Sequence, residues 1–419
     1  MITSLVIVGL GYVGLPLTYE AVRAGLSVKG LDTSETIVAS LNAGQSHIDD
    51  LDDQQIAAMV ESGFIASADP SIVAEADVVV ICVPTPLKEG TTPDLSAVEG
   101  AARAVGTHLQ PGSLVVLEST TYPGTTDDVV APILQQASQL EPGVDFHLAF
   151  SPERIDPGNQ NFGLRNTPKV VGGYTPGCTE RAVEFYSSIV DTIVPTVGTR
   201  EAELAKLLEN TYRHVNIALV NEMAIFCREM GIDLWAAIDA AATKPFGFQA
   251  FYPGPGVGGH CIPIDPNYLS FSVESLGYKF RFVELAQEIS GRMPTYVARR
   301  AQDLLNDHGK AINGSRVVLL GVAYKADVSD QRETPARPLA RRLMEMGAEV
   351  SYFDSYVDRF DVDEHTLPRH DQLSDACASS DLAIVVQSHS DIAGQTCLDT
   401  AKLILDTRGV LTGSNVEKL

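Results

Sequence analysis

The chain is poor in basic residues. Its 419 residues contain 30 Lys and Arg against 54 Asp and Glu, which gives a formal net charge of −24. An acidic surface of this kind repels phosphate backbones, so we expect no nucleic-acid partner. It does not exclude a small phosphorylated ligand, because clustered backbone N–H groups can outweigh a distant field.

Two other features are missing. No apolar stretch is long enough to span a bilayer, and the first residues lack the basic region and the small-residue cleavage site of a signal peptide. We therefore expect a cytoplasmic protein that does not associate with membranes. The six cysteines include no CxxC pair, which argues against a disulfide framework and against a metal site.

Short apolar runs alternate with helical patterns in the N-terminal half of the chain. A continuous apolar run, as expected of a strand buried on both faces, occupies 5–8. A second strand is expected at 27–31, and further short apolar runs lie at 78–83, 114–117, 146–150 and 169–171. Helical stretches such as 95–109 and 126–137 separate several of them. This order predicts an α/β fold with a doubly wound parallel sheet. The alternation resumes at residue 316 and predicts a second Rossmann-like sheet.

A long helical pattern separates these two parts. From Glu201 to Met230 the apolar residues recur at intervals of three and four or their multiples, and Gly231 ends the pattern. A helix this long often bridges domains or forms a dimer face. We predict two Rossmann-like domains joined by a central helical domain, with boundaries at 1–199, 200–307 and 308–419.

A glycine motif follows the first strand. It reads Gly9-Leu10-Gly11-Tyr12-Val13-Gly14. Gly9 permits a tight turn, Gly11 lets a pyrophosphate approach the backbone, and Gly14 lets helix and strand pack closely. Asp32 ends the second strand, where a carboxylate accepts hydrogen bonds from ribose hydroxyls and repels a 2′-phosphate. We interpret the motif as a site for NAD rather than NADP; the alternative is a structural turn that binds nothing.

Polar residues also end three later strands. Thr85 follows the strand at 78–83 and Thr120 follows the strand at 114–117, at the edge where such sheets bind ligands. Both could equally be ordinary turn residues. Glu153 follows the strand at 146–150, and a carboxylate there can act as a base or form a salt bridge.

The densest glycine cluster precedes Cys261. Four glycines from Gly254 to Gly259 allow the backbone to wrap closely around a ligand. Asp265 follows Cys261 by four residues, so a helical turn would place both on one face. A helix start favours a thiolate, and the dinucleotide site elsewhere in the chain favours covalent catalysis by Cys261. The loop and its cysteine could also be structural.

Two polar residues of the long helix stand one turn apart. Lys206 and Asn210 project from the same side, offset from the apolar stripe. A solvated polar face is the ordinary explanation of such a pair. Farther along, Asn221 is expected to serve helix packing or a dimer contact.

Taken in order, these motifs resemble those of the UDP-glucose/GDP-mannose dehydrogenase family along essentially the whole chain. The matching segments are GLGYVG, CVPTP, STTYPG, SPER, EAELAKLLENTYRHVNIALVNE, GPGVGGHCIPID and GVAYKADVSDQRETP. The resemblance implies that the C6 hydroxyl of a UDP-sugar is oxidised twice by NAD, to the carboxylate. Cys261 would capture the intermediate aldehyde as a thiohemiacetal and then carry a thioester, which water hydrolyses.

The resemblance also implies roles for individual residues. Asp265 and Lys206 handle water and stabilise oxyanions, with Asn210 as their hydrogen-bonding companion. Thr120 and Glu153 lie near the nicotinamide and the reacting carbon, and Glu153 is a candidate general base. The implied substrate-binding residues are Glu153, Arg154, Lys206, Asn210, Lys244, Phe251, Tyr252, Gly254, Gly256, Gly258, Lys325 and Arg408.

Two segments favour the branch that acts on UDP-N-acetylhexosamines: Ser151-Pro-Glu-Arg154 and Lys244-Pro-Phe-Gly-Phe248. The preferred substrate is UDP-N-acetylglucosamine, for a surface polysaccharide, with UDP-N-acetylmannosamine, UDP-N-acetylgalactosamine and UDP-glucose as alternatives. Rival functions are a single-step NAD-dependent hydroxyacid dehydrogenase and a non-catalytic NAD or UDP-sugar sensor. We expect a homodimer formed through residues near 200–300.

Overall fold

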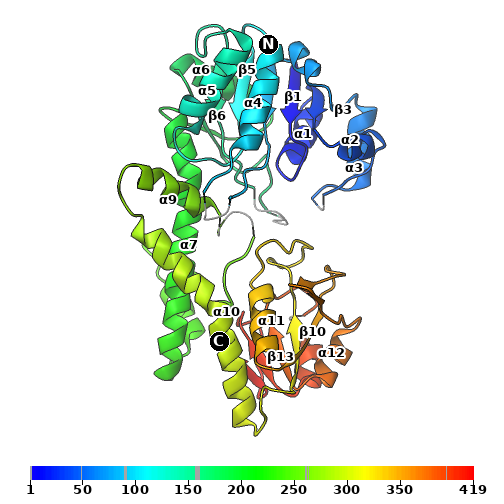
Figure 1. The fold of residues 1–419 in the computed structure, drawn as a ribbon, viewed down its shortest axis with the longest axis vertical. Coiled ribbons are helices and arrows are strands. Elements are labelled where there is room, and N and C mark those ends of the chain that lie inside the picture. The colour runs from blue at the N-terminus through cyan, green and yellow to red at the C-terminus, as the bar shows by residue number, and fades with distance from the viewer. Residues whose placement is uncertain are drawn as a thin grey trace. The chain divides into compact units, whose positions relative to one another are not determined.

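The computed structural model describes residues 2–48, 50–88, 92–155, 161–259, 262, 264–392 and 394–419. The chain divides into two compact units, each built around a sheet (Figure 1). The first unit comprises Met1–Glu209 and Asn267–Tyr278, and the second comprises Asn210–Pro266 and Lys279–Leu419.

The first unit contains an eight-stranded sheet in the order β3-β2-β1-β4-β5-β6-β7-β8. Its strands are β1 (Ser4–Val8), β2 (Ser27–Leu31), β3 (Ile65–Ser67), β4 (Val78–Ile81), β5 (Leu114–Leu117), β6 (His147–Phe150), β7 (Lys169–Gly173) and β8 (Ile193–Pro195). Neighbouring strands are parallel except β6 and β7, which pair antiparallel. The predicted α/β fold is confirmed, with this pair as a departure from a purely parallel sheet.

Both faces of this sheet are covered, which explains why its central strands are apolar throughout. Alternate residues of a strand point to opposite faces and so enter two different cores. One core is formed with helices α1 (Gly14–Arg23), α3 (Asp53–Glu61) and α6 (Pro176–Tyr186). The other is formed with α4 (Ser96–His108) and α5 (Ala131–Ser138).

Local sequence signals set several helix ends in this unit. Ser34 caps α2 (Glu35–Asn42) by accepting a hydrogen bond from a backbone N–H of its first turn. Asp52 and Gln55 form a reciprocal capping box at the start of α3. The helix expected at 126–137 begins instead with one π-helical turn, Thr126–Val130, before α5.

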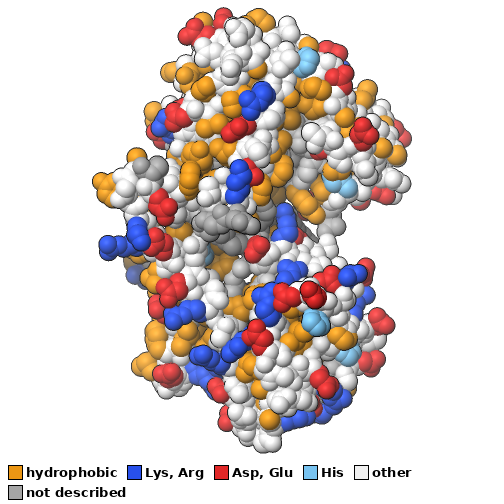
Figure 2. Space-filling view, in the orientation of Figure 1, with side chains coloured by type: hydrophobic (Ala, Val, Ile, Leu, Met, Phe, Trp, Pro, Cys, Tyr) orange, Lys and Arg blue, Asp and Glu red, His pale blue; other side chains and the backbone are white. Residues whose placement is uncertain are grey.

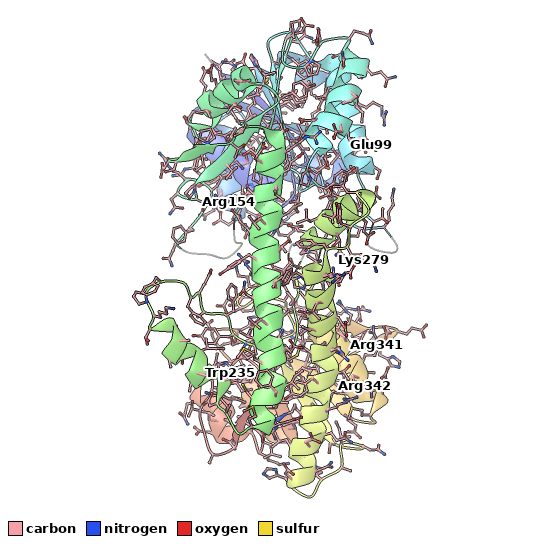
Figure 3. All side chains as sticks on the ribbon, turned by 90° about the vertical axis from the view of Figure 1, so that its left-hand side faces the viewer. Glu99, Arg154, Trp235, Lys279, Arg341 and Arg342 are labelled. Carbon is pink, nitrogen blue, oxygen red and sulfur yellow. The ribbon has the colours of Figure 1, made fainter. Side chains whose placement is uncertain are left out.

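The long helix predicted between the two sheets is α7 (Thr199–Glu229), followed by Gly231 with a φ of +69°. In Figure 3 it is the long central helix, with α10 (Arg281–Asp307) beside it. Two shorter helices lie between them in the sequence, α8 (Leu234–Ala242) and α9 (Asp265–Ser275). No helix in the described part of the chain combines the length and the apolar character needed to cross a membrane.

The second unit contains a five-stranded parallel sheet in the order β10-β9-β13-β14-β15. Its strands are β9 (Arg316–Leu320), β10 (Glu349–Phe353), β13 (Leu382–Val385), β14 (Ile404–Asp406) and β15 (Val416–Lys418). Residues of α7, α8, α10 and α11 (Ala336–Glu345) join the core on one face. Residues of α12 (Leu373–Ser379) and α13 (Gln395–Thr400) join the core on the other. The strands β11 (Asp361–Val362) and β12 (His365–Thr366) form a small hairpin.

The two sheets begin with the same backbone turn. Gly9 after β1 and Gly321 after β9 have φ values of +92° and +74°. The N–H of each donates to the last residue of the neighbouring strand, β2 or β10, at 2.8 and 2.9 Å. A Cβ on either glycine would lie against a backbone oxygen, at 2.7 Å from Cys82 and at 2.3 Å from Gln387. The C-terminal sheet therefore repeats the first turn of the N-terminal sheet.

We expect Gly321→Ala to destabilise the second unit much more than Gly314→Ala. Both glycines have positive φ, +74° and +77°, but a Cβ at Gly314 would meet nothing within 4 Å. Gly314→Ala should cost about 1–2 kcal/mol through its backbone conformation alone. Gly321→Ala should cost about 2 kcal/mol more, because the backbone at Gln387 must move. Urea denaturation measures both, and equal losses would contradict the steric argument.

Candidate functional site

The glycine motif forms an open turn at the carboxyl end of β1. A Cβ at Gly14 would lie 1.9 Å from the carbonyl oxygen of Gly9, whereas a Cβ at Gly11 would meet nothing within 4 Å. Gly14 is therefore required for packing, and Gly11 leaves open space that a side chain would occupy. The helix α1 starts at Gly14, and a helix N-terminus attracts an anion. This turn fits the pyrophosphate of NAD.

Asp32 lies half-buried at the end of β2, beside this turn. Its Oδ2 accepts the N–H of Leu10 and its Oδ1 accepts the N–H of Ser34, both at 2.9 Å. The two bonds fix the carboxylate and leave further lone pairs on its oxygens for ribose hydroxyls. In the same turn Tyr12 is exposed and Val13 is half-buried. The arrangement fits NAD and disfavours a 2′-phosphate.

The two threonines predicted near the cofactor follow β4 and β5. Thr85 is buried, and its carbonyl accepts the hydroxyl of Tyr268 from α9. Thr120 is half-buried, and the preceding Ser119 donates to the carbonyl of Val83 at 2.7 Å. Because β1, β4 and β5 are parallel neighbours, both threonines lie at the same edge of the sheet as the glycine turn.

Glu153 holds two lysines of the first unit. Its backbone carbonyl accepts Nζ of Lys206 at 2.5 Å, and its Oε2 lies 3.4 Å from Nζ of Lys169. Its Oε1 accepts the N–H groups of Arg154 and Ile155, each at 2.6 Å. Lys206 and Lys169 are both buried. The direction of the Glu153 carboxylate is thus set by the chain that follows it and by Lys169.

Lys169 and Glu118 form a buried ion pair that sequence analysis missed. Nζ lies 2.9 Å from Oε1, and the side chains are 4% and 0% exposed. Tyr186 donates its hydroxyl to the same carboxylate, and the ammonium lies 5.2 Å from its ring centre. Burial raises the pKa of Glu118 despite Lys169. Burial lowers the pKa of Lys169, but the charges of Glu118 and Glu153 outweigh burial and raise it. The sequence offered one signal for this ion pair, a lysine as the first residue of an apolar strand.

Glu203 anchors the first turn of α7. Its buried carboxylate accepts the N–H of Gly124 at 2.6 Å and both the N–H and the hydroxyl of Thr126, at 2.9 and 2.7 Å. Burial raises the pKa of Glu203 to about 7, against the lowering effect of these bonds. A carboxylate at the start of a helix is also favoured by the helix dipole.

In the second unit, two predicted catalytic residues meet. Nδ2 of Asn210 donates to Oδ2 of Asp265 at 2.5 Å, and both side chains are buried. The helix α9 begins at Asp265, later than the helical turn considered from Cys261. Cys261 itself lies outside the described residues.

Asn221 and Arg408 border the glycine loop. Oδ1 of Asn221 accepts the N–H of Gly254 at 2.9 Å, so this residue does more than the packing expected of it. A Cβ at Gly254 would lie 3.1 Å from Nη1 of Arg408. Burial lowers the pKa of Arg408 to about 10, against the raising effect of Asp406, and the guanidinium stays charged at neutral pH. A desolvated guanidinium is well suited to a phosphate.

The rest of the loop packs on the segment 324–335. A Cβ at Gly256 would lie 3.1 Å from Pro335, and a Cβ at Gly258 would lie 2.9 Å from a backbone oxygen of this segment. Lys325 is half-buried in the same segment. Glycine at these positions is therefore needed for the loop to approach its own chain.

Two of the predicted basic contacts have other neighbours. Arg154 directs its guanidinium to the carboxylate of Glu209, at 2.7 and 3.2 Å, and to the carbonyl of Pro168 at 2.6 Å. Figure 3 shows Arg154 beside α7. Lys244 is exposed and lies 4.9 Å from the ring centre of Phe246.

The two predicted aromatic contacts also pair within the second unit. Tyr252 is 45% exposed and donates its hydroxyl to Asp239 at 2.7 Å. Phe251 packs edge-on against Tyr212, with ring centres 5.8 Å apart.

His214 is a buried residue that the sequence did not single out. It follows Asn210 by one turn of α7 and shares its side with Asn221. Its side chain is 2% exposed, and its Nδ1 has no hydrogen-bond partner within the described ranges. Burial lowers the pKa of His214 to about 4. A neutral imidazole therefore lies between the two asparagines.

Comparison with known sequences places all three parts of the chain in one family. Residues 3–190 match the NAD binding domain of the UDP-glucose/GDP-mannose dehydrogenase family. Residues 200–291 match its central domain, and residues 318–413 match its UDP binding domain. The chain belongs to the UDP-glucose/GDP-mannose dehydrogenase family. It is accordingly an NAD-dependent oxidoreductase, as the resemblance of its motifs indicated.

Individual members of this dehydrogenase family resemble the chain over most of its length. UDP-N-acetyl-D-glucosamine 6-dehydrogenase of Pseudomonas aeruginosa is 35% identical over 361 residues, which cover 85% of this chain and 83% of that protein. UDP-N-acetyl-D-mannosamine dehydrogenase of Methanococcus maripaludis is 33% identical, covering 98% and 93%. The solved structure of UDP-D-ManNAc dehydrogenase from Pyrococcus horikoshii matches with a TM-score of 0.90 at 30% identity, covering 99% of each chain.

The lowered pKa of His214 predicts a loss of stability in mild acid. The unfolded chain gains a proton near pH 6.5, whereas the folded chain does so near pH 4. The stability contributed by the neutral ring is therefore complete above pH 6.5 and is lost as the pH falls toward 4. From pH 7.5 to 5 the loss should be about 2 kcal/mol.

The measurement is the free energy of unfolding of the second unit at both pH values. The variant His214→Gln should lack this pH-dependent component, whatever its absolute stability. The matched control His365→Gln changes an exposed histidine of the hairpin. This control should keep the pH-dependent component of stability. Identical pH dependence in wild type and His214→Gln would contradict the prediction.

Proposed function

We propose that the chain oxidises the C6 hydroxyl of a UDP-N-acetylhexosamine to the carboxylate, with UDP-N-acetylglucosamine as substrate, for synthesis of a surface polysaccharide. The polar side of α7 carries the proposal. Lys206 and Asn210 are both buried there, the first bonded to Glu153 and the second to Asp265. Burying such groups is costly, and these are the groups that stabilise an oxyanion and orient water.

The proposed reaction converts one CH2OH group, two NAD⁺ and one water into a carboxylate, two NADH and three protons. NAD, when bound, would accept the hydride in each oxidation. The sulfur of Cys261 adds to the intermediate aldehyde to give a thiohemiacetal, and oxidation of its carbon gives a thioester. Water then cleaves the C–S bond and releases the carboxylate and the thiol.

Each residue has a distinct part in this proposal. The Lys206 ammonium stabilises the developing oxyanion by about 3 kcal/mol. Asp265, oriented by Asn210, holds the attacking water, and Glu153 accepts its proton. The role of Cys261 is supported by its place in the motif GPGVGGHCIPID.

The division of labour along the chain is also a proposal. Residues 1–199 bind NAD, residues 200–307 supply catalytic groups and the dimer contact, and residues 308–419 bind the UDP-sugar. The matches to an NAD binding domain at 3–190 and a UDP binding domain at 318–413 support the first and the last assignment. The half-buried guanidinium of Arg408 supports contact with a diphosphate.

The relatives support two N-acetylhexosamines. The Pseudomonas enzyme named for UDP-N-acetylglucosamine has 35% identity, while the Methanococcus enzyme named for UDP-N-acetylmannosamine matches 98% of this chain at 33% identity. UDP-N-acetylmannosamine is therefore the second candidate. Both share the same C6 chemistry and differ at C2.

The exposed side of α7 supports a homodimer. In the second unit Leu219 and Phe226 of α7 are 52% and 44% exposed, and Met230 directly after this helix is 66% exposed. Phe282 and Leu285 of α10 are 67% and 52% exposed. Apolar side chains gathered on helices in this way are typical of an interface. Figure 2 shows hydrophobic side chains among mixed charges on the face it draws. We propose that a second copy of the chain covers this side.

We expect two NADH per UDP-sugar consumed. The measurement is NADH absorbance at limiting substrate, across UDP-N-acetylglucosamine, UDP-N-acetylmannosamine, UDP-N-acetylgalactosamine and UDP-glucose. Turnover should be fastest with UDP-N-acetylglucosamine. One NADH per substrate would favour a single-step dehydrogenase, and binding without NADH would favour a sensor.

The same assay uses two cysteine variants as controls. Cys261→Ser should bind NAD and UDP-sugar but lose turnover, about 100-fold or more, since it removes the nucleophile. Cys178→Ser changes a buried cysteine of α6 and should keep wild-type turnover. Full activity of Cys261→Ser would remove covalent catalysis from the proposal.

The dimer is tested with Leu219→Glu/Phe226→Glu, which places two charges on the proposed interface. Wild-type protein should elute with twice the chain mass of 44.9 kDa, as measured by light scattering, and the double variant as a monomer. The control Val144→Glu changes a 73% exposed residue of the first unit and should remain dimeric. A monomeric wild type would disprove the homodimer.

A further inference from the structure

The buried cluster of Lys169, Glu118 and Tyr186 has no part in the mechanism above. The cluster contacts one residue of that mechanism, Glu153, whose Oε2 lies 3.4 Å from Nζ of Lys169. The cluster is formed within the first unit by residues at the ends of β5, β7 and α6. The cluster therefore contacts the carboxylate of a candidate base on the side where Lys169 lies.

Exposure falls along the cluster. The side chain of Glu153 is 12% exposed, that of Lys169 is 4% exposed and that of Glu118 is 0% exposed. Within this group of described residues, Glu153 is therefore the member that can exchange a proton with a ligand or with water. Lys169 and Glu118 are more deeply buried, and Lys169 interacts with the Glu153 carboxylate through its ammonium.

The charges explain why one lysine is paired with two carboxylates. If Glu153 takes up a proton, its attraction for Lys169 is lost, and an unpaired buried ammonium would be costly. Glu118 remains 2.9 Å from the same ammonium, and Tyr186 donates to Glu118. Lys169 is thus paired whether Glu153 is charged or neutral.

Glu153 also contacts Lys206, the residue proposed to stabilise the oxyanion. The carbonyl of Glu153 accepts Nζ of Lys206 at 2.5 Å, while its carboxylate faces Lys169. A rotation of the Glu153 carboxylate away from Lys169 would also break the hydrogen bonds that its Oε1 accepts from the N–H groups of Arg154 and Ile155. Lys169 and these two N–H groups therefore hold the carboxylate in one direction.

We propose that Lys169 is a positioning residue, which fixes the direction of the Glu153 carboxylate and keeps it ionised for proton transfer, with Glu118 as its permanent counter-ion. This rests on the proposed function, in which Glu153 accepts a proton from the attacking water. The proton passes from water to Glu153 and then to solvent, and Lys169 keeps its own proton throughout.

The experiment compares Lys169→Met, Lys169→Arg and Glu118→Gln with wild type. Lys169→Met should keep the KM for NAD, lower kcat about tenfold or more, and move the acid limb of the kcat/KM profile up by about one pH unit. Lys169→Arg, which keeps the charge, should restore most of kcat and the acid limb. Glu118→Gln should move the acid limb to lower pH, because it removes the carboxylate that competes for the ammonium.

Matched controls separate this effect from general destabilisation. Lys29→Met removes a lysine of β2 that pairs with Glu75 at the surface, and it should leave the profile unchanged. If Lys169→Met does not fold, the acid limbs of Lys169→Arg and Glu118→Gln test the proposal in its place. Wild-type acid limbs in every folded variant, or a loss of kcat in Lys169→Met that Lys169→Arg does not reduce, would overturn the proposal.

A readout without turnover separates this proposal from the proposed function. Infrared difference spectra between pH 5 and 8 report protonated carboxyl groups. The part of the carboxyl signal that Glu153→Gln removes should appear about one pH unit higher in Lys169→Met than in the protein with Lys169. If no UDP-sugar is oxidised but this shift appears, the proposed function fails while the interaction of Lys169 with Glu153 stands. If two NADH are formed and the shift is absent, the positioning role fails alone.

Discussion

The helix α7 carries a row of buried polar residues while several of its apolar residues are exposed, and the arrangement of the site depends on this buried polar row. Five of its buried polar residues recur at intervals of three, four and seven, which places them on one side of a helix. These five are Glu203, Lys206, Asn210, His214 and Asn221. Four of them are hydrogen-bonded to segments that carry other site residues, each within its own unit. A buried polar group without a partner costs about 1–3 kcal/mol, so these bonds fix the register of each segment against the helix.

The distribution of residues along α7 also explains what the sequence could predict and what it could not. The spacing of apolar residues identified the long helix, and the glycine motif with Asp32 identified the cofactor turn, because both signals are local. Periodicity alone does not tell whether an apolar stripe faces a core or a partner, and on α7 Leu219 and Phe226 remain exposed. The positions of Lys169 and Asn221 depend on segments far away in the chain, which no local pattern specifies.

The two sheets share a first turn but differ in what that turn can bind. In the second unit Asp354 stands where Asp32 stands in the first, after the strand that neighbours the turn. Its Oδ2 accepts the N–H of Val322 at 2.7 Å and faces Nε2 of His389 at 2.9 Å, deep in the core. Asp32 is half-buried and keeps lone pairs available, whereas Asp354 is enclosed. A carboxylate sealed by a histidine cannot receive a ribose, so the repeated turn serves packing in the second sheet.

Charge distribution reconciles an acidic chain with anionic ligands. With a net charge of −24, the chain as a whole repels both a dinucleotide and a sugar nucleotide. Local dipoles and buried cations act at shorter range and in a less polar medium, where they are stronger. The turn before α1 offers backbone N–H groups, and Arg408 offers a guanidinium that burial weakens as a base to a pKa of about 10 without neutralising it. Because that charge has already lost much of its water, a phosphate approaching it has less hydration to displace, and short-range attraction can prevail over the distant acidic field.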